Sequence, residues 1–263
     1  MKTIYSFLIL ISIYLIVQGI SLKIGLNFIP KISSGEIPPA VQEPEKAETS
    51  GEIFLYILFI TLIFIFLLKL NLGIIIKILM SFAMFTGISI TFWSFFPFPF
   101  WIALSVLFYL IFILKRENIV ISNLALILTI AGIGGYLGAS LHFIPSLLLL
   151  LILSAYDIIA VFGTKHMVTL ATEAKDKIPM FSVPIKERFL GIGTGDLAIP
   201  SMFTVSILQD FSFLHSLFTI FGGLIGLISL FLFILKKERV TLPALPPITI
   251  GLFLGFLLGF ILL

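Results

Sequence analysis

Long apolar stretches alternate with short polar breaks along the chain, and this pattern dominates the sequence. Most stretches have the roughly 17–25 residues that a helix needs to cross the hydrocarbon layer of a membrane. They are too long and too uniformly apolar for barrel strands, in which polar and apolar positions alternate over about 10 residues. The pattern predicts nine membrane-spanning helices: Tyr5–Ile20, Ile53–Leu68, Ile74–Phe92, Phe98–Leu114, Ile119–Leu137, Phe143–Phe162, Phe189–Leu208, Phe211–Leu235 and Leu242–Leu263.

The segment after the first stretch differs from the rest of the chain. Residues 23–52 carry four prolines and five glutamates without a periodic apolar pattern, so we expect a polar linker there. The first stretch follows Lys2 as a secretory signal would, but no small-x-small cleavage site follows it, and we favour a retained span. We predict one integral membrane domain, with a five-span half at 1–140 and a four-span half at 141–263.

Composition narrows the class of protein. The chain is 60% hydrophobic and only 11% charged, whereas soluble proteins carry about 25% charged residues. This excludes a soluble globular domain, a disordered chain and a nucleic-acid-binding protein. With no cysteine and only three histidines, neither a thiolate nucleophile nor a metal site is expected, and we predict no cofactor.

The basic residues set the predicted orientation. If the amino terminus lies inside, 13 of the 16 lysines and arginines fall on the inner side, and only Lys23, Lys31 and Lys46 fall outside. Loops on the cytoplasmic side are enriched in Lys and Arg. We therefore expect a multi-pass protein of the cell membrane with an inner amino terminus and an outer carboxyl terminus.

Two acids lie where lipid should exclude them. Only Asp157 and Asp196 lie clear of the ends of the predicted spans, and neither of their spans contains a Lys or Arg. An ionised carboxylate at mid-bilayer costs about 2.5–3.5 kcal/mol even on lenient scales. Counted from the inner ends of the sixth and seventh spans, both acids lie roughly 9–11 Å beneath the inner surface. Two consecutive antiparallel helices thus carry carboxylates at matching depth.

Paired carboxylates support a definite chemistry. Close together in a low-dielectric site they share one proton, because both cannot readily ionise at once. One then activates a water as general base while the other protonates a scissile carbonyl, as in aspartic proteases. Buried carboxylates also serve proton- or cation-coupled secondary transporters. Depth and number alone support these two functions equally.

The residues around the acids favour the protease. Tyr156 directly precedes Asp157, Gly193-Thr194-Gly195 precedes Asp196, and Pro243-Ala244-Leu245 stands where the last span begins. This ordered set of YD, GxGD and PAL motifs resembles the presenilin and signal peptide peptidase family of GxGD intramembrane aspartyl proteases. The resemblance covers residues 141–263, and the first half of the chain adds only a matching number of spans.

The resemblance implies an all-α, presenilin-like transmembrane bundle with Asp157 and Asp196 as the catalytic pair. It also implies that two glycines and the PAL segment border the active site, where the glycines allow close approach and the prolines make the start of the last span non-helical. The supporting residues are Gly193, Gly195, Pro243, Ala244 and Leu245. Tyr156 is a further candidate, which either bonds a carboxylate or packs against a helix.

Alternatives within the protease class stay open. An inner loop between the two catalytic spans is the arrangement of presenilin, whereas Phe162-Gly163-Thr164 and Asp196–Pro200 are closer to signal peptide peptidase. The topology of the substrate therefore stays open, and the short loop Thr164–Arg188 predicts no self-cleavage. Prepilin-type peptidases also use a GxGD aspartate, but their nearby lysine is missing after Asp196 and the PAL motif is present.

We therefore expect an intramembrane aspartic endopeptidase that acts in the lipid bilayer on single-span helical substrates. The unwound substrate is expected to pair as a strand with backbone near Pro243–Leu245 or Ile178–Ile185. Gly251, Gly255 and Gly259 recur at four-residue spacing, which predicts either close helix contacts within the bundle or a homo-oligomer.

Overall fold

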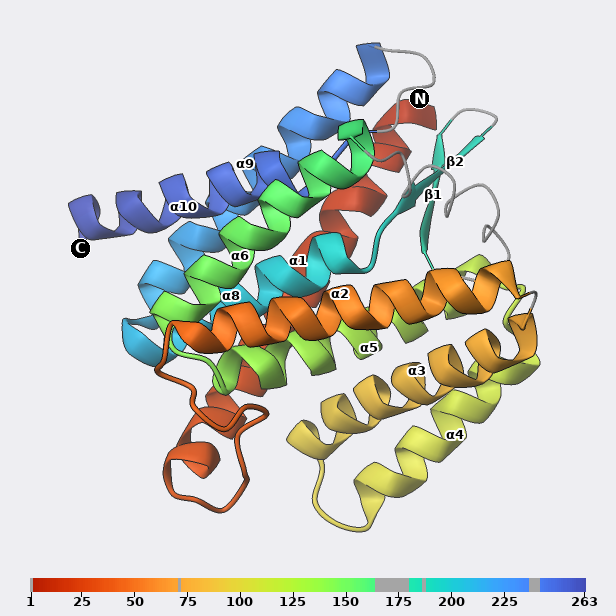
Figure 1. Cartoon of the computed structure of the whole chain (residues 1–263), viewed down its shortest axis with the longest axis horizontal. Coiled ribbons are helices and arrows are strands. Elements are labelled where there is room, and N and C mark those ends of the chain that lie inside the picture. The colour runs from red at the N-terminus through yellow and green to blue at the C-terminus, as the bar shows by residue number, and fades with distance from the viewer. Residues whose placement is uncertain (1, 71, 164–179, 186–187, 237–241) are drawn as a thin grey trace.

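The computed structural model describes residues 2–70, 72–163, 180–185, 188–236 and 242–263, and these form a bundle of helices with one β-hairpin (Figure 1). Along the chain the described elements are α1 (Lys2–Ser33), α2 (Glu48–Lys69), α3 (Gly73–Phe95), α4 (Phe100–Leu114), α5 (Ile119–Ala139), α6 (Phe143–Ile158), the π-helix η1 (Ile159–Gly163), strands β1 (Phe181–Ile185) and β2 (Arg188–Ile192), α8 (Gly195–Asp210), α9 (Phe213–Lys236) and α10 (Leu245–Leu262).

The described α-helices follow the nine predicted spans one for one, which confirms the all-α, polytopic prediction. Seven of them are long and apolar enough to cross a membrane. The other two, α4 and α8, have 15 and 16 residues. At 1.5 Å per residue they extend about 22–24 Å, less than a hydrocarbon layer of about 30 Å. A helix as short as α8 leaves one of its ends inside that layer.

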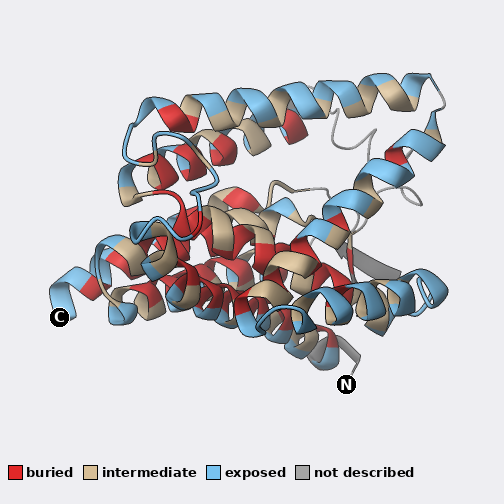
Figure 2. Cartoon of the chain, turned by 90° about the horizontal axis from the view of Figure 1, so that it is seen from below, coloured by how far each residue is buried: buried red, intermediate tan, exposed pale blue. Residues whose placement is uncertain are grey.

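Helix α8 forms the centre of the bundle. It contacts α1, α5, α6, α9 and α10, and the buried residues gather in this middle part of the molecule (Figure 2). Three of its polar residues, Ser201, Thr204 and Ser206, are fully buried. Each hydroxyl donates to a carbonyl oxygen of the same helix three or four residues earlier, so their burial leaves no hydroxyl proton unpaired.

Helix α1 is longer than the predicted span Tyr5–Ile20 and continues through the first part of the segment expected to be a linker. Its polar residues there are satisfied by other helices: the Ser21 hydroxyl donates to the Ala131 carbonyl at 3.3 Å, and the Asn27 amide donates to the Ser94 carbonyl at 2.8 Å. Ile24 and Phe28 are fully buried beside them. The boundary was predicted too early because these partners lie far away in the sequence.

Helices α9 and α10 share the most extensive contact between described elements. A side chain at Gly251 would meet the Gly222 carbonyl, and one at Gly255 would meet the Phe218 carbonyl. The predicted close contacts are thus confirmed. Because Gly251 and Gly255 face α9, they do not offer a surface to a second copy of the chain.

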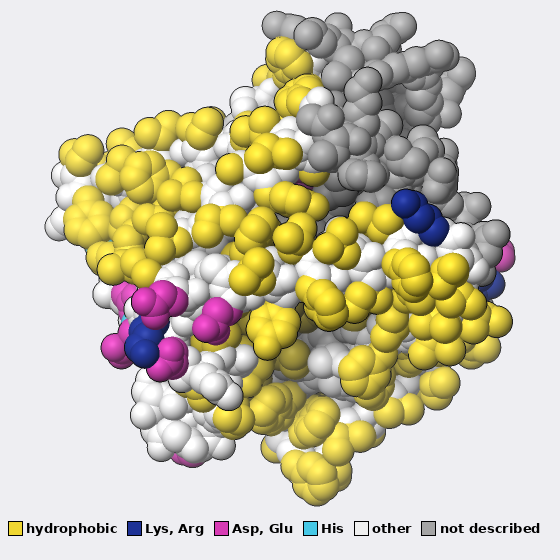
Figure 3. All heavy atoms as spheres, in the orientation of Figure 1, with side chains coloured by type: hydrophobic (Ala, Val, Ile, Leu, Met, Phe, Trp, Pro, Cys, Tyr) yellow, Lys and Arg dark blue, Asp and Glu magenta, His cyan; other side chains and the backbone are white. Residues whose placement is uncertain are grey.

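The outer surface is suited to lipid. Large aliphatic and aromatic side chains are exposed on most helices, and they cover much of the face in Figure 3, where acidic side chains gather at one edge. In the segment before α2, the Glu43 carboxylate accepts a hydrogen bond from Lys46 Nζ at 2.6 Å and raises the pKa of that exposed ammonium. The apolar belt and the charged edge are what an integral membrane protein requires.

A polar cluster joins the start of α6 to the end of α8. Asp210 Oδ2 accepts a hydrogen bond from the Phe143 backbone N–H at 2.5 Å, and its Oδ1 lies 2.7 Å from His142 Nδ1. The His142 backbone N–H donates to the Pro44 carbonyl at 3.1 Å. Asp210 thereby caps a helix to which it does not belong, and the cluster fixes α6, α8 and the segment before α2 relative to one another.

Replacing Asp210 by Ala is expected to lower the free energy of unfolding by about 1–3 kcal/mol, because hydrogen bonds to a charged acceptor are lost. The melting temperature of the purified protein in detergent measures this loss. Glu45→Ala is the control, since its carboxylate is 82% exposed and 3.7 Å from His142 Nε2, and it should change the melting temperature little. Equal melting temperatures for the two variants would contradict the capping role.

Candidate active site

Asp157 lies in the last turn of α6 and is half-buried. Its Oδ2 accepts a hydrogen bond from the backbone N–H of Leu245 at 3.1 Å, and the Ala244 N–H also faces it. Leu245 is the first residue of α10, and the first N–H groups of a helix have no partner within the helix. The carboxylate therefore satisfies a donor that the fold leaves free.

Asp196 is the second residue of α8 and lies in its first turn. The positive end of the helix dipole favours a carboxylate at this position. The side chains of Asp157 and Asp196 lie close enough to interact electrostatically. The structure thus brings the two predicted acids together, each at the amino-terminal end of a helix.

The matching depth of the two acids has a different origin from the one predicted. Phe189–Leu208 is not a single helical span: Arg188–Ile192 forms β2, and α8 starts only at Gly195. Fourteen residue steps separate Asp157 from Phe143 on α6, and fourteen separate Asp196 from Asp210 on α8. Since Phe143 and Asp210 are bonded to each other, both acids stand about 21 Å from that bond along their helices.

The β-hairpin leads directly into the site. Strands β1 and β2 pair antiparallel, with Phe181 opposite Ile192. Phe181 and Val183 are fully buried, and β1 contacts α1 and α5. This anchoring of the hairpin holds the start of α8. The apolar alternation at 181, 183 and 185 was the available sequence signal for β1. The signal for β2 was hidden, because most of this strand falls inside the predicted span Phe189–Leu208.

The two glycines of the GxGD motif have different surroundings. A Cβ added at Gly193 would lie 2.8 Å from Asp196 Oδ2, whereas one at Gly195 would meet no protein atom within 4 Å. Gly193 therefore makes room for the carboxylate. Gly195 is exposed and leaves space that none of the described residues fills.

The PAL segment lies beside the acids. Leu242–Ala244 is not helical, as predicted, and α10 begins at Leu245. Pro246 and Pro247 fall in the first turn of that helix, where a missing N–H costs nothing. The side chain of Leu245 is 5% exposed and packs with Leu149 and Leu153 of α6. The role of its backbone N–H was not predicted, because backbone donors leave no mark in a sequence.

Tyr156 points toward another helix. Its ring packs edge-to-face on Phe54 of α2, with the ring centroids 5.8 Å apart. Of the two alternatives for Tyr156, the structure favours packing, and a role in the site stays a prediction. The π-helix η1 directly after Asp157 was not predicted. Such π-turns are rare and often occur at functional sites.

This arrangement suits acid–base chemistry at one centre. Two carboxylates close enough to interact can share one proton, and such a pair offers one group that accepts a proton and one that donates it. A transmembrane helical bundle with such an acid pair has the features that a membrane-embedded aspartyl protease requires.

Comparison with known families agrees. The model of the family described as signal-peptide peptidase, presenilin aspartyl protease matches residues 11–190, more than half of the chain. The chain belongs to this family and is therefore an intramembrane aspartic endopeptidase. The match includes Asp157 and ends before Asp196. It also covers most of residues 1–140, the half of the chain in which the sequence alone offered no motif.

Solved structures show the same fold. Two crystal structures described as a presenilin-family intramembrane aspartate protease, in space groups C222 and P2, superpose with TM-scores of 0.69 and 0.62. They are 22% and 24% identical in sequence; each covers 97% of this chain, which covers 99% and 97% of theirs. No curated protein matches the chain.

Gly193→Ala is expected to lower the cleavage rate about tenfold, because the new methyl group displaces the Asp196 carboxylate by a large fraction of an ångström. The melting temperature should stay the same, since the displaced atoms end a flexible side chain. A cleavage assay of the purified variant with a transmembrane peptide measures the effect, and a rate equal to that of the parent protein would contradict it. In Gly195→Ala the new methyl group meets no described protein atom within 4 Å. A slower cleavage rate in this variant at an unchanged melting temperature would therefore mean that the methyl group obstructs the substrate.

Proposed function

We propose that this protein hydrolyses peptide bonds of transmembrane helical substrates by a general acid/base mechanism, with Asp157 and Asp196 acting on a water molecule. The observation that carries the proposal is the meeting of these two carboxylates at the amino-terminal ends of α10 and α8. Membership of an aspartyl protease family supports it.

The proposed reaction has two proton transfers at each stage. The ionised carboxylate takes a proton from water while the water oxygen attacks the peptide carbonyl carbon, and the protonated carboxylate gives its proton to the carbonyl oxygen. Collapse of the tetrahedral intermediate breaks the C–N bond: the carboxyl group that took the proton from water gives it to the nitrogen, and the other carboxylate takes a proton from a hydroxyl of the intermediate, which becomes the carboxyl group of the product. The Leu245 N–H holds Asp157 Oδ2 in place. No acyl-enzyme forms in this scheme.

The substrate helix must unwind before its peptide bonds reach the acids. Among the described residues, each strand of the hairpin pairs on one edge only, and an extended substrate can add to the other edge by backbone hydrogen bonds. Strand addition to the hairpin is favoured over addition at Pro243–Leu245, because the Leu245 N–H is already bonded to Asp157. Of the predicted segment Ile178–Ile185, residues 178 and 179 lie outside the described part of the chain.

We further propose that the protein lies in the cell membrane with its amino terminus inside and its carboxyl terminus outside. This orientation rests on the 13 of 16 basic residues that it places on the inner side. It puts the acids near the inner surface and the His142–Asp210 cluster near the outer surface.

A secondary transporter would use the same two carboxylates, but none of the comparisons points to one. The family match also speaks against a prepilin-type peptidase. An assay without a gradient separates transport from hydrolysis: the purified protein in detergent should cut a transmembrane peptide with no second compartment present. Intact peptide under these conditions would contradict the proposed function.

Asp157→Asn and Asp196→Asn are each expected to abolish detectable cleavage, because an amide cannot exchange the proton that the mechanism requires. Mass spectrometry of the peptide products measures this. Both variants should remain folded, with melting temperatures near that of the parent protein. Glu52→Gln, which neutralises an exposed acid on α2, is the control and should cleave normally. Residual cleavage in either Asn variant above about 1% would contradict a shared role.

The rate of cleavage is expected to depend on pH as a bell-shaped curve, because the reaction needs one ionised and one protonated carboxylate. The rate should fall on the acidic side as the base becomes protonated and on the alkaline side as the acid ionises. Steady-state rates in detergent over a series of buffers test this. A rate that rises or falls in one direction only would contradict a pair sharing one proton.

A further inference from the structure

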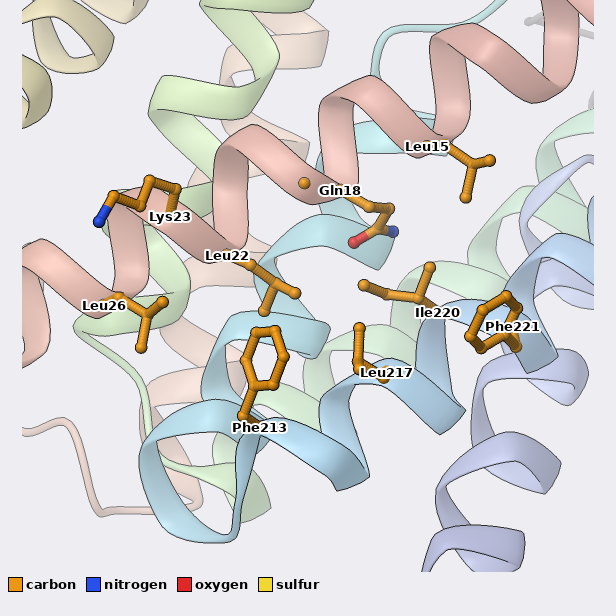
Figure 4. A pocket seen from close by; sticks show the side chains of 10 residues that line it. Leu15, Gln18, Leu22, Lys23, Leu26, Phe213, Leu217, Ile220 and Phe221 are labelled. Carbon is orange, nitrogen blue, oxygen red and sulfur yellow. The ribbon is translucent and has the colours of Figure 1, made fainter.

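A cavity of about 360 Å³ lies between α1 and α9, and none of its lining residues belongs to the motifs of the active site (Figure 4). Its volume falls within the roughly 300–1,000 Å³ of small-molecule sites. Its walls are apolar and are contributed mainly by Leu15, Leu22 and Leu26 of α1 and Phe213, Leu217 and Phe221 of α9. Such walls suit a hydrocarbon chain.

One polar side chain faces this apolar cavity. Gln18 is only 1% exposed, and its amide projects from α1 toward α9 (Figure 4). Neither its nitrogen nor its oxygen has a hydrogen-bond partner among the described residues. The neighbouring Tyr14 hydroxyl lies near this amide but donates to the Ile220 carbonyl at 3.1 Å, and it does not meet the geometry of a hydrogen bond with Gln18. An unpaired amide in an apolar setting is costly, so an occupant that brings a hydrogen-bonding group would be stabilised here.

A charge stands at one end of the same cavity. Lys23 lies with Leu26 and Phe213 at one end, and Leu15 and Phe221 lie at the other (Figure 4). From Leu15 to Leu26 the cavity follows α1 for about 16 Å, which is close to half of a hydrocarbon layer of about 30 Å. The cavity therefore extends through one leaflet, from a cation near the membrane surface toward the middle of the bilayer.

We propose that this cavity binds one glycerophospholipid from the leaflet at which α1 ends and α9 begins. The lipid phosphate pairs with the Lys23 ammonium, an ester carbonyl oxygen accepts a hydrogen bond from the Gln18 amide, and one acyl chain continues from there past Leu15 and Phe221 toward the middle of the bilayer. The three groups of the lipid follow one another in the order of the three features along α1. The proposal is independent of the proteolytic mechanism.

Gly19 provides a variant that closes the cavity without disturbing the fold. It lines the cavity between Gln18 and Lys23, and a Cβ added there meets no described atom within 4 Å, so Gly19→Leu should place its side chain in the space of the lipid glycerol, between the ester and the phosphate. Gly51→Leu is the matched control, because a Cβ at Gly51 on α2 also meets no atom within 4 Å. Both variants are expected to melt near the parent temperature in lipid-free detergent.

The experiment measures binding of dioleoylphosphatidylglycerol by native mass spectrometry of the full chain in detergent. The parent protein and Gly51→Leu are expected to retain one lipid, and Gly19→Leu is expected to bind at least about tenfold more weakly, because the new side chain clashes with the lipid glycerol. Gln18→Leu should weaken binding about fivefold through the lost hydrogen bond. Unchanged binding by Gly19→Leu would overturn the proposal.

Dioleoylglycerol, which has the same chains and esters but no phosphate, tests the part of Lys23. Lys23→Gln should weaken binding of the phospholipid about fivefold and leave binding of dioleoylglycerol unchanged. Lys31→Gln, on the same helix but outside the cavity, should change neither. Equal effects of Lys23→Gln and Lys31→Gln would overturn the pairing with phosphate. A dimer that Gly19→Leu dissociates would instead make the cavity an interface between two copies.

Discussion

The structure depends on placing two carboxylates inside a layer that excludes charge. Each acid faces the amino-terminal end of a helix, where backbone N–H groups have no partner of their own. Asp157, at the end of α6, bonds the first N–H of α10, and Asp196 belongs to the first turn of α8. The polar ends of two helices thus stabilise the acid pair, and the acid pair satisfies helix ends that lipid would leave unpaired.

This constraint explains why the bundle is irregular near the acids. Helix α8 is shorter than a full membrane span, β2 replaces the expected first turns, and η1 follows the helix that carries Asp157. Irregular backbone at membrane depth is tolerated only where protein buries it or where it lines a water-filled space. The buried side chains of Phe181 and Val183 provide the first condition, and the open space beside Gly195 is consistent with the second.

Much of this fold was predictable, because hydrophobicity in a membrane protein reports directly which segments are helical. The order of the nine described α-helices followed from the apolar runs. The positions of the two acids followed from the charges that interrupt these runs. The end of α1 was not predictable, since Ser21 and Asn27 look like linker residues until their partners on α5 and α3 are known. The same holds for the donor to Asp157: any residue type at 245 except proline would supply it, so the sequence bears no trace of its role.

The hydrogen bond between the Phe143 N–H and the Asp210 carboxylate joins α6 and α8 at one end, and the two acids lie toward the opposite ends of these helices. Each acid lies about 21 Å along its helix from this hydrogen bond, so a change of about 5° in the angle between the helices changes the separation of the two acids by about 2 Å. Such a displacement is large for a reaction in which misplacement by about 1 Å costs a hundredfold in rate. The hydrogen bond at one end of the two helices therefore bears on the spacing of the two carboxylates at the other end, and so does the segment before α2, which holds His142 through the Pro44 carbonyl.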